Sequence, residues 1–424
     1  MKRVTAALIG AGARGMDAYG RYALEHPHDI AFVAVAEPDP ERREKFKNLH
    51  GISDDMCFES WKQLLEQPGL ADAALVCTQD RMHFQPALEA LEKGYHLLLE
   101  KPMSIDPLEC IAVGEAAGKS GKTALVCHVL RYTPFFRSIK ELLDNGKIGR
   151  LISIQHNENV GYYHQAHSYV RGNWRNSDVS SPMILAKSCH DMDILLWLAG
   201  SECTRISSFG SLTHFRSENA PDGAPDRCLD GCPAEAACPY YAPRLYLTPS
   251  TDWPASVISV DTSLEARERA LREGPYGRCV YKCDNNVVDH QVASIEFANE
   301  VTAVFTMCAF TPEISRTLKL MGTRGEIRGS MEKNEIEVTD FNSGRREIIN
   351  LNGGASGHGG GDAALMGDFA RLVREGGGGS GFTSATHSVL SHLMAFAAEK
   401  SRLSGKTVDM EDYINGLKKT VRGV

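Results

Sequence analysis

The chain has 424 residues, a formal net charge of −8, 42% hydrophobic and 24% charged residues. This composition is typical of a globular protein with two or three domains. The basic residues form no block and no apolar run approaches the ~20 residues of a membrane-spanning helix, so we expect no nucleic-acid or membrane partner. Because an apolar strand-like run begins at residue 4, we expect no secretory leader. The twelve cysteines are then expected to be reduced thiols or metal ligands in a cytoplasmic protein.

The first forty residues predict a dinucleotide-binding unit. An apolar run at 4–9 is followed by a glycine-rich turn at 10–15, an amphipathic stretch, a second apolar run at 30–36 and then Glu37. This is the order of strand, turn, helix, strand and acid that such a site requires, although a GxGxxG turn alone is a weak signal.

Each glycine of the turn has an expected role. Gly10 allows the chain to turn off the strand, Gly12 leaves room for a pyrophosphate, and Gly15 lets the helix pack closely on the sheet. The phosphates would then meet free N–H groups at the helix N-terminus.

Glu37 predicts a preference for NAD. A carboxylate at this strand end can accept hydrogen bonds from the ribose hydroxyls, and its charge would repel the 2′-phosphate of NADP. Arg42 and Arg43 follow closely and could pair with that phosphate, so NADP stays a less favoured alternative.

Strands and helices alternate up to about residue 127, which predicts a doubly wound, mostly parallel sheet. After Glu37 the expected strands are 73–77, 95–99 and 123–126, and the expected helices are 40–49, 60–65, 83–93 and 107–119. In such sheets ligands bind at the carboxyl ends of the strands.

The pattern changes after residue 128 to a helix at 135–143 and runs that alternate as in half-buried strands. These runs are 150–159, 203–211, 287–297, 301–310, 316–321, 325–328 and 335–339, and helices are expected at 362–374 and 385–402. Short connections predict an antiparallel sheet, interrupted by a Pro-, Cys- and Tyr-rich insertion at about 213–286.

The predicted fold is therefore α/β, with a Rossmann domain at 1–127 and an α+β domain at 128–424. The second domain would contain a large, mainly antiparallel open sheet and the insertion, and its C-terminal helices would pack back toward the first domain.

Glu100-Lys101-Pro102 directly follows a predicted strand, beside the expected position of a nicotinamide. Together with the glycine turn, this triplet resembles the signature of the glucose–fructose oxidoreductase and inositol dehydrogenase (Gfo/Idh/MocA) superfamily, over essentially the whole chain. The resemblance is carried by 10–15, 36–39, Thr78 with His83, 100–102, and His190 with Asp193. It implies a Rossmann domain, an α/β domain whose open sheet often supports oligomers, and a cis Lys101–Pro102 peptide in many members.

Lys101 and His190 are the predicted catalytic residues. An ammonium held against a hydroxyl stabilises the alkoxide that develops as hydride leaves, and the resemblance gives this role to Lys101. By the same resemblance His190 is the acid/base group. Many relatives carry an aspartate four residues earlier, where this chain has Ala186, so a standard Asp–His relay is in doubt and Lys187 could contribute a charge instead. A surface lysine after a strand is the alternative for Lys101.

The remaining site residues fall into two groups. The predicted cofactor-binding residues are Gly10, Gly12, Ala13, Arg14, Gly15, Glu37, Thr78, Gln79, His83, Glu100 and Lys101. The predicted substrate-binding residues, rings and polar groups of the kind that bind sugars, are Arg131, Tyr132, His167, Arg171, Trp174, Lys187 and Asp193. An ordinary interface loop is the alternative for the members between 162 and 174.

Five cysteines of the insertion, Cys228, Cys232, Cys238, Cys279 and Cys283, lie within 56 residues. Four of the five could hold a structural metal, zinc first and iron–sulfur second, and so stabilise a segment with little core of its own. The spacing is not that of a typical zinc knuckle, and plain reduced thiols are the alternative.

The sequence thus predicts an NAD-dependent oxidoreductase that acts on a hydroxyl of a sugar, cyclitol or derivative, assembled as a dimer or tetramer. A redox-neutral glycosidase that retains NAD and cleaves by transient oxidation and elimination is the alternative from the same superfamily. A sugar-sensing regulator is disfavoured by the intact Glu100-Lys101-Pro102 and His190.

Overall fold

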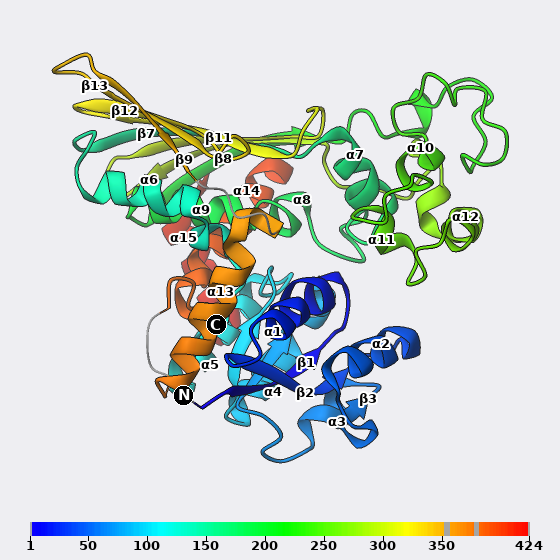
Figure 1. The fold of residues 1–424 in the computed structure, drawn as a ribbon. Helices are drawn as coiled ribbons and strands as arrows, with labels where there is room; N and C mark the ends of the chain where they lie inside the picture. The colour runs from blue at the N-terminus through cyan, green and yellow to red at the C-terminus, as the bar shows by residue number, and fades with distance from the viewer. Residues whose placement is uncertain (1, 352–356, 377–380, 423–424) are drawn as a thin grey trace.

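The computed structural model describes residues 2–351, 357–376 and 381–422, and its first layer is a six-stranded parallel sheet (Figure 1). The strand order β3-β2-β1-β4-β5-β6 is that of a dinucleotide-binding Rossmann fold, as predicted. The strands are β1 (Val4–Ile9), β2 (Ile30–Ala36), β3 (Cys57–Phe58), β4 (Ala73–Val76), β5 (His96–Leu99) and β6 (Ala124–Val126).

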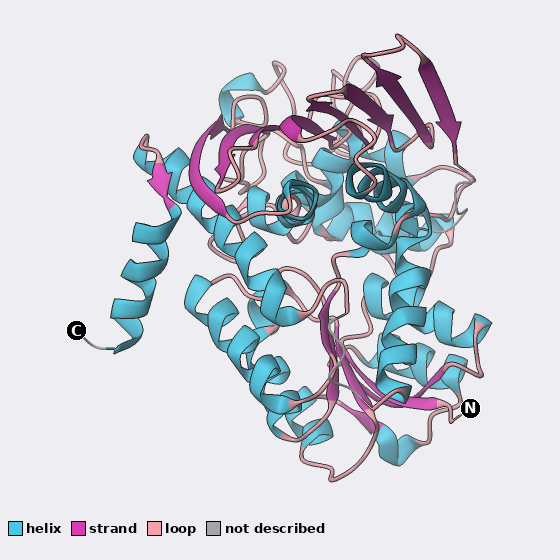
Figure 2. Ribbon diagram, turned by 90° about the vertical axis from the view of Figure 1, so that its left-hand side faces the viewer, coloured by secondary structure: helices cyan, strands magenta, loops and turns pink. Residues whose placement is uncertain are grey.

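Helices cover both faces of this sheet (Figure 2). They are the π-helical turn η1 (Arg14–Gly20), α1 (Arg21–Glu25), α2 (Pro40–His50), α3 (Trp61–Leu65), α4 (Phe84–Glu92) and α5 (Pro107–Ser120). Asp39 and Asp106 cap α2 and α5 through hydrogen bonds to free backbone N–H groups, and a proline follows each cap. The predicted helices lie within one or two residues of these bounds.

The second layer is a nine-stranded open sheet in the order β14-β13-β12-β11-β7-β10-β9-β8-β15. Its strands are β7 (Leu151–Asn159), β8 (Cys203–Ser211), β9 (His290–Phe297), β10 (Thr302–Cys308), β11 (Ser315–Gly322), β12 (Gly325–Ser330), β13 (Glu335–Asp340), β14 (Arg346–Asn350) and β15 (Val408–Asp409). The predicted antiparallel character is confirmed for all pairs except β7 and β10, which run parallel. Strands β3, β14 and β15 were not predicted, and they are short or mostly exposed.

One face of the nine-stranded sheet packs on helices and the other is open (Figure 1). The helices from this half are α6 (Pro134–Asp144), α7 (Tyr162–His164), α8 (Met183–Ala186), α9 (Cys189–Ala199), α13 (Gly361–Arg374), α14 (Ala385–Ser404) and α15 (Met410–Arg422). Helix α13 returns to the first sheet, where Leu365, Met366 and Phe369 share a core with Leu8 and Tyr19. Within the described residues no helix is long and apolar enough to cross a membrane.

The insertion extends beyond one end of the nine-stranded sheet, next to α7 (Figure 1). It forms α10 (Ala242–Tyr246), α11 (Ala255–Ile258) and α12 (Leu264–Glu273). The expectation of little core was wrong, because two small hydrophobic clusters lie in it. One surrounds Phe215 and Tyr240, and the other surrounds Tyr246 and Leu271.

Candidate active site

The glycine turn after β1 has the geometry that a dinucleotide needs. Gly10 has φ +96°, and a Cβ atom built there would lie 2.7 Å from the carbonyl oxygen of Cys77. A Cβ on Gly15 would lie 2.3 Å from the carbonyl oxygen of Gly10, whereas one on Gly12 would meet no described atom within 4 Å. Gly10 and Gly15 are therefore required by the chain itself, and the open space over Gly12 fits a pyrophosphate.

Glu37 is buried at the end of β2 and faces this turn. Its carboxylate accepts hydrogen bonds from the backbone N–H of Ala11 (2.7 Å) and of Asp39 (3.0 Å). The guanidinium of Arg43 donates to the Glu37 carbonyl oxygen. The carboxylate is thus fixed beside the glycine turn, and Ala13 begins the helical segment that follows.

Arg14 is held by side chains from three parts of the chain. It donates to Glu100 (Nε to Oε1, 2.7 Å), to the Tyr19 hydroxyl (2.7 Å) and to Asp362 of α13. Burial disfavours the charged form of Glu100, but Arg14, Lys101 and a hydrogen bond from Tyr19 hold the pKa of Glu100 below its ordinary value. Arg14 therefore links the glycine turn to the Glu100-Lys101-Pro102 triplet and to α13.

Lys101 lies at the carboxyl end of β5, and the Lys101–Pro102 peptide is cis. The Lys101 ammonium donates to the carbonyl oxygen of Ala186, at the end of α8 (2.7 Å). The ring of His83 lies between the carbonyl oxygens of Pro102 (Nδ1, 2.6 Å) and Thr78 (Nε2, 3.0 Å). His83 thereby connects the loops after β4 and β5, the loops that begin with Thr78-Gln79 and Glu100-Lys101.

Three histidines gather beside Lys101. The His128 ring lies 5.7 Å from that of His190 and 5.3 Å from that of His392. His392 accepts from the backbone N–H of Met103 (3.0 Å), two residues after Lys101. Burial, then the charges of Arg131 and Lys101, keep the pKa of His128 well below its ordinary value, so His128 is neutral.

Asp193, on the first helical turns of α9, forms a bidentate ion pair with Arg131 (2.6 and 2.7 Å). Burial raises the pKa of Asp193, and the Arg131 charge opposes that shift. Tyr132 is buried and its hydroxyl donates to Asp368 of α13. Arg131, Tyr132 and Asp193 thus hold the helices around the histidines together.

Lys187 lies in a separate buried charge network. Its ammonium is 3.0 Å from Glu158 of β7, which also pairs with Arg316. Arg316 in turn bonds Asp191 (Nε to Oδ1, 2.8 Å), which also bonds the His156 ring (2.8 Å). Burial lowers the pKa of Lys187, and the Glu158 charge opposes that shift. Glu158 therefore balances the charge of Lys187 within the protein.

Three other predicted substrate residues bind protein groups around the insertion. Arg171 is fully buried and donates to the carbonyl oxygens of Arg278 and Tyr240 (2.7 Å each). The His167 ring stacks on Tyr276 at 4.8 Å. The indole N–H of Trp174 donates to Asp80 of the first domain (2.9 Å). Each of these three side chains is thus bonded to or stacked on protein groups.

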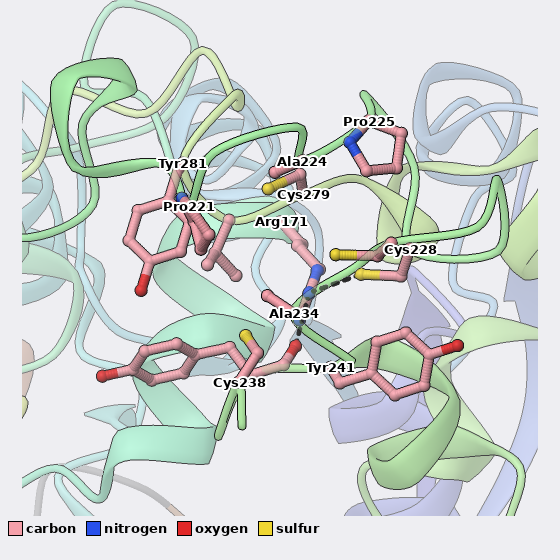
Figure 3. Close-up of a pocket in the computed structure, with 13 residues that line it drawn as sticks. Arg171, Pro221, Ala224, Pro225, Cys228, Ala234, Cys238, Tyr241, Cys279 and Tyr281 are labelled. Carbon is pink, nitrogen blue, oxygen red and sulfur yellow. Dashed lines mark hydrogen bonds between the residues drawn. The ribbon is translucent and has the colours of Figure 1, made fainter. Parts of the chain in front are cut away.

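The cysteine cluster does not support the predicted metal site. Cys228, Cys232, Cys238 and Cys279 line a pocket that also contains the Arg171 guanidinium, which is 3.7 Å from the Cys228 sulfur (Figure 3). In the described part of the chain, no group of three or more His, Cys, Asp or Glu side chains is arranged to hold a metal ion.

Cys283 stands apart from the other four and donates to the carbonyl oxygen of Cys279. Burial raises the pKa of Cys238, Cys279 and Cys283. Without a metal, these three thiols stay protonated at neutral pH.

Several site residues were not singled out from the sequence. They are Tyr19, Asp362 and His392. Asp362 and His392 come from segments remote in sequence, and only the tertiary fold brings them to the site. Tyr19 follows the glycine turn closely and bonds Arg14.

Comparisons with known proteins agree with this geometry. Residues 4–128 match the profile of an oxidoreductase family with an NAD-binding Rossmann fold, and residues 140–410 match the family's C-terminal α/β domain. An inositol 2-dehydrogenase of Saccharopolyspora erythraea is 30% identical over 226 residues, 52% of this chain and 60% of that protein. The Bacillus subtilis protein YteT, named as an oxidoreductase, is 26% identical over 364 residues, 80% of this chain and 81% of YteT.

Solved structures share the fold. A levoglucosan dehydrogenase in complex with NADH and levoglucosan has a TM-score of 0.72 and 18% identity, over 96% of this chain and all of that one. An Agrobacterium radiobacter oxidoreductase in complex with NAD⁺, L-tartaric acid and magnesium has a TM-score of 0.69 and 15% identity, over 97% of this chain and all of that one.

Proposed function

The chain belongs to the glucose–fructose oxidoreductase and inositol dehydrogenase superfamily, and we propose that it is an NAD-dependent dehydrogenase acting on a hydroxyl of a sugar, cyclitol or derivative. The observation that carries this proposal is the position of Lys101. Its ammonium stands at the carboxyl end of β5, close to the start of α9, which carries His190.

Lys101 would act on the hydroxyl that reacts. Its ammonium is held against a neutral carbonyl oxygen, that of Ala186, and not against a carboxylate. The ammonium therefore keeps donors for a substrate oxygen and can stabilise the alkoxide that develops there. Bound NAD would accept the hydride from the same carbon.

His190 would exchange the hydroxyl proton. It lies on the first turn of α9, and its ring contacts neutral His128. Ala186 stands where many relatives carry an aspartate, so no carboxylate from that position can orient His190. We propose that His128 supplies part of that environment, with its ring packed against those of both His190 and His392.

Glu37 supports NAD as the cofactor. Two backbone hydrogen bonds fix its carboxylate beside the glycine turn, where a 2′-phosphate would meet its negative charge. The relatives' names support a carbohydrate-like substrate, because they include inositol and levoglucosan dehydrogenases.

The test is incubation of the protein with NAD and a panel of sugars and inositols, with NADH absorbance and product mass both recorded. The proposal expects NADH and a product two mass units lighter for at least one compound. Lys101→Met should abolish turnover while NAD still binds, and Lys119→Met, on the exposed surface of α5, is the matched control. Glycoside cleavage without NADH would establish the redox-neutral glycosidase instead.

We also propose that the open face of the nine-stranded sheet binds a second copy of the chain. Phe209, Val292 and Val304 are exposed on this face, and Phe209 pairs directly with Val292 in register. Apolar side chains gathered in this way mark association surfaces. Light scattering after chromatography should show a dimer or tetramer that Phe209→Lys weakens and Phe341→Lys, on a distant exposed turn, does not.

A further inference from the structure

A buried ion network joins the segment before α9 to the middle of the nine-stranded sheet. Glu158 of β7 and Arg316 of β11 lie directly opposite each other in register, and their charged groups form an ion pair (2.5 Å). Glu158 also pairs with the Lys187 ammonium (3.0 Å), and Arg316 also pairs with Asp191 (2.8 Å). The four side chains therefore form one continuous network in which positive and negative charges alternate.

This network is buried and balanced in charge. The side chains of Glu158 and Asp191 are fully buried, and those of Arg316 and Lys187 are only 7% and 12% exposed. Burial disfavours the charged form of Asp191, but the Arg316 charge and a hydrogen bond from His156 hold the pKa of Asp191 below its ordinary value. Apolar side chains of similar volume often join such elements with equal stability, so stability alone does not explain why the protein buries four charges here.

Lys187 and Asp191 flank the groups that the proposed reaction uses. Ala186, next to Lys187, accepts the hydrogen bond from the Lys101 ammonium (2.7 Å). His190, next to Asp191, lies on the first turn of α9. The segment between α8 and α9 is short, so the two outer ion pairs of the network hold both of its ends against β7 and β11.

We propose that Glu158 and Arg316 are positioning residues for catalysis, which act through the segment 186–191. They hold the two ends of this segment at a fixed distance and direction from the sheet, and the segment in turn places both predicted catalytic groups. Ion pairs suit this role because charged hydrogen-bonding groups fix direction as well as distance, and a misplacement of about 1 Å can lower a reaction rate ~10²-fold. This inference rests on the proposed dehydrogenase function and deepens it.

The kinetic test removes the connection to β7 and keeps the charge balance. In the double variant Glu158→Gln/Lys187→Met one carboxylate and one ammonium are lost together, and the ion pair of Arg316 with α9 remains, so the Tm should stay close to that of the unmodified protein. With the best substrate of the sugar and inositol panel, kcat should fall by about 10- to 10²-fold while KM and NAD affinity change less than about threefold. Lys147→Met/Glu347→Gln, which removes an exposed pair of the same kind, is the matched control and should keep its kcat.

Substitutions of Arg316 give a second test that does not depend on the double variant. Arg316→Lys keeps the charge and can pair with one carboxylate, whereas Arg316→Met can pair with none. Arg316→Lys should therefore retain more of the kcat than Arg316→Met. The inference is overturned if kcat is unchanged in the folded double variant, or if KM rises at unchanged kcat, which would show that Lys187 contacts the substrate directly.

Hydrogen–deuterium exchange separates this inference from the proposed function. Uptake into a peptide spanning 183–193 is followed by mass spectrometry in the NAD-loaded protein without any sugar. The double variant Glu158→Gln/Lys187→Met should exchange faster in this peptide than the unmodified protein and the Lys147→Met/Glu347→Gln control. Faster exchange supports the attachment of the segment even if no sugar is oxidised, in which case only the dehydrogenase proposal fails. Unchanged exchange overturns the inference whatever the activity.

Discussion

The glycine turn and the cysteine-rich insertion solve the same problem, a loop that must hold its shape, by different means. The shape of the turn is set by backbone sterics, because a Cβ at Gly10 or Gly15 would clash with a backbone oxygen. Of the three glycines, Gly12 alone faces open space. In the insertion, buried guanidinium groups satisfy backbone carbonyls. Arg171 donates to two, and Arg267 donates to those of Tyr246, Thr248 and Ser250.

The difference shows which features can be inferred from a sequence. The steric requirements of a short turn involve neighbouring residues only. Glycines at the restricted positions therefore indicate these requirements in the sequence itself. A buried arginine that donates to carbonyl oxygens tens of residues away produces no recognisable spacing in the sequence. The cysteines, in contrast, are conspicuous in the sequence, so the prediction for the insertion was based on them. If this contrast is right, substitutions near the glycine turn should affect cofactor binding and catalysis, and substitution of Arg171 should affect the stability of the insertion.

The largest effect is expected at Lys101. Lys101→Ala should lower turnover by about 10²–10⁴-fold, the contribution of a positioned proton-transfer group. NAD affinity should change little, because the glycine turn and Glu37 are untouched. Steady-state kinetics and NAD titration measure the two quantities. Near-normal turnover of Lys101→Ala would show that Lys101 does not act on the reacting hydroxyl.

The glycines should separate folding from cofactor binding. Gly15→Ala places a methyl group 2.3 Å from a backbone oxygen, so the protein should lose thermal stability or fail to fold. Gly12→Ala meets no described atom within 4 Å and should keep its Tm while its NAD affinity falls. Calorimetry with and without NAD distinguishes the two variants. An equal loss of Tm in both would contradict the assignment of a packing role to Gly15 and a cofactor-binding role to Gly12.

Arg171→Met tests the insertion. The variant leaves the buried carbonyl oxygens of Arg278 and Tyr240 without their donor, and each unsatisfied group costs about 1–3 kcal/mol. Limited proteolysis should then cut within 213–286 sooner than in the unmodified protein. Arg175→Met, which removes a half-exposed ion pair to Asp284, is the control. Unchanged cleavage would show that the insertion's clusters suffice without Arg171.

Glu37→Ser should shift the cofactor preference more modestly. Loss of one charge-assisted hydrogen bond of ~1.5 kcal/mol corresponds to about tenfold in NAD affinity. NADP binding should improve at the same time, because the repelling charge is gone and Arg43 stays nearby. Titrations with both cofactors measure the change. Equal use of NAD and NADP by the unmodified protein would show that the arginines outweigh Glu37.

The same contrast explains what the sequence could and could not predict. The sequence predicted the parallel sheet and the roles of Gly10, Gly12 and Gly15, because strand periodicity and a short turn motif are local properties. The family resemblance predicted the cis Lys101–Pro102 peptide. The roles expected for Arg171 and the cysteines depended on which distant groups face them. A fully buried arginine among thiols could not be anticipated from their spacing.

The last expected effect is an acid sensitivity that begins where the insertion contacts α7 and the turn after it. Burial and the charge of Arg171 lower the pKa of His167 from 6.5 to about 3. The folded protein therefore keeps His167 neutral while the unfolded chain binds a proton below pH 6.5. The free energy of unfolding should fall as the pH is lowered from 6.5 to 3, by at most ~1.4 kcal/mol per pH unit from this group.

Denaturant titrations of the unmodified protein and His167→Gln across this range should show a shallower decline in the variant. His28→Gln, at an exposed position, should follow the unmodified protein. A decline as steep in His167→Gln as in the unmodified protein would assign the acid sensitivity to other buried groups, such as His392, whose pKa burial also lowers to about 3.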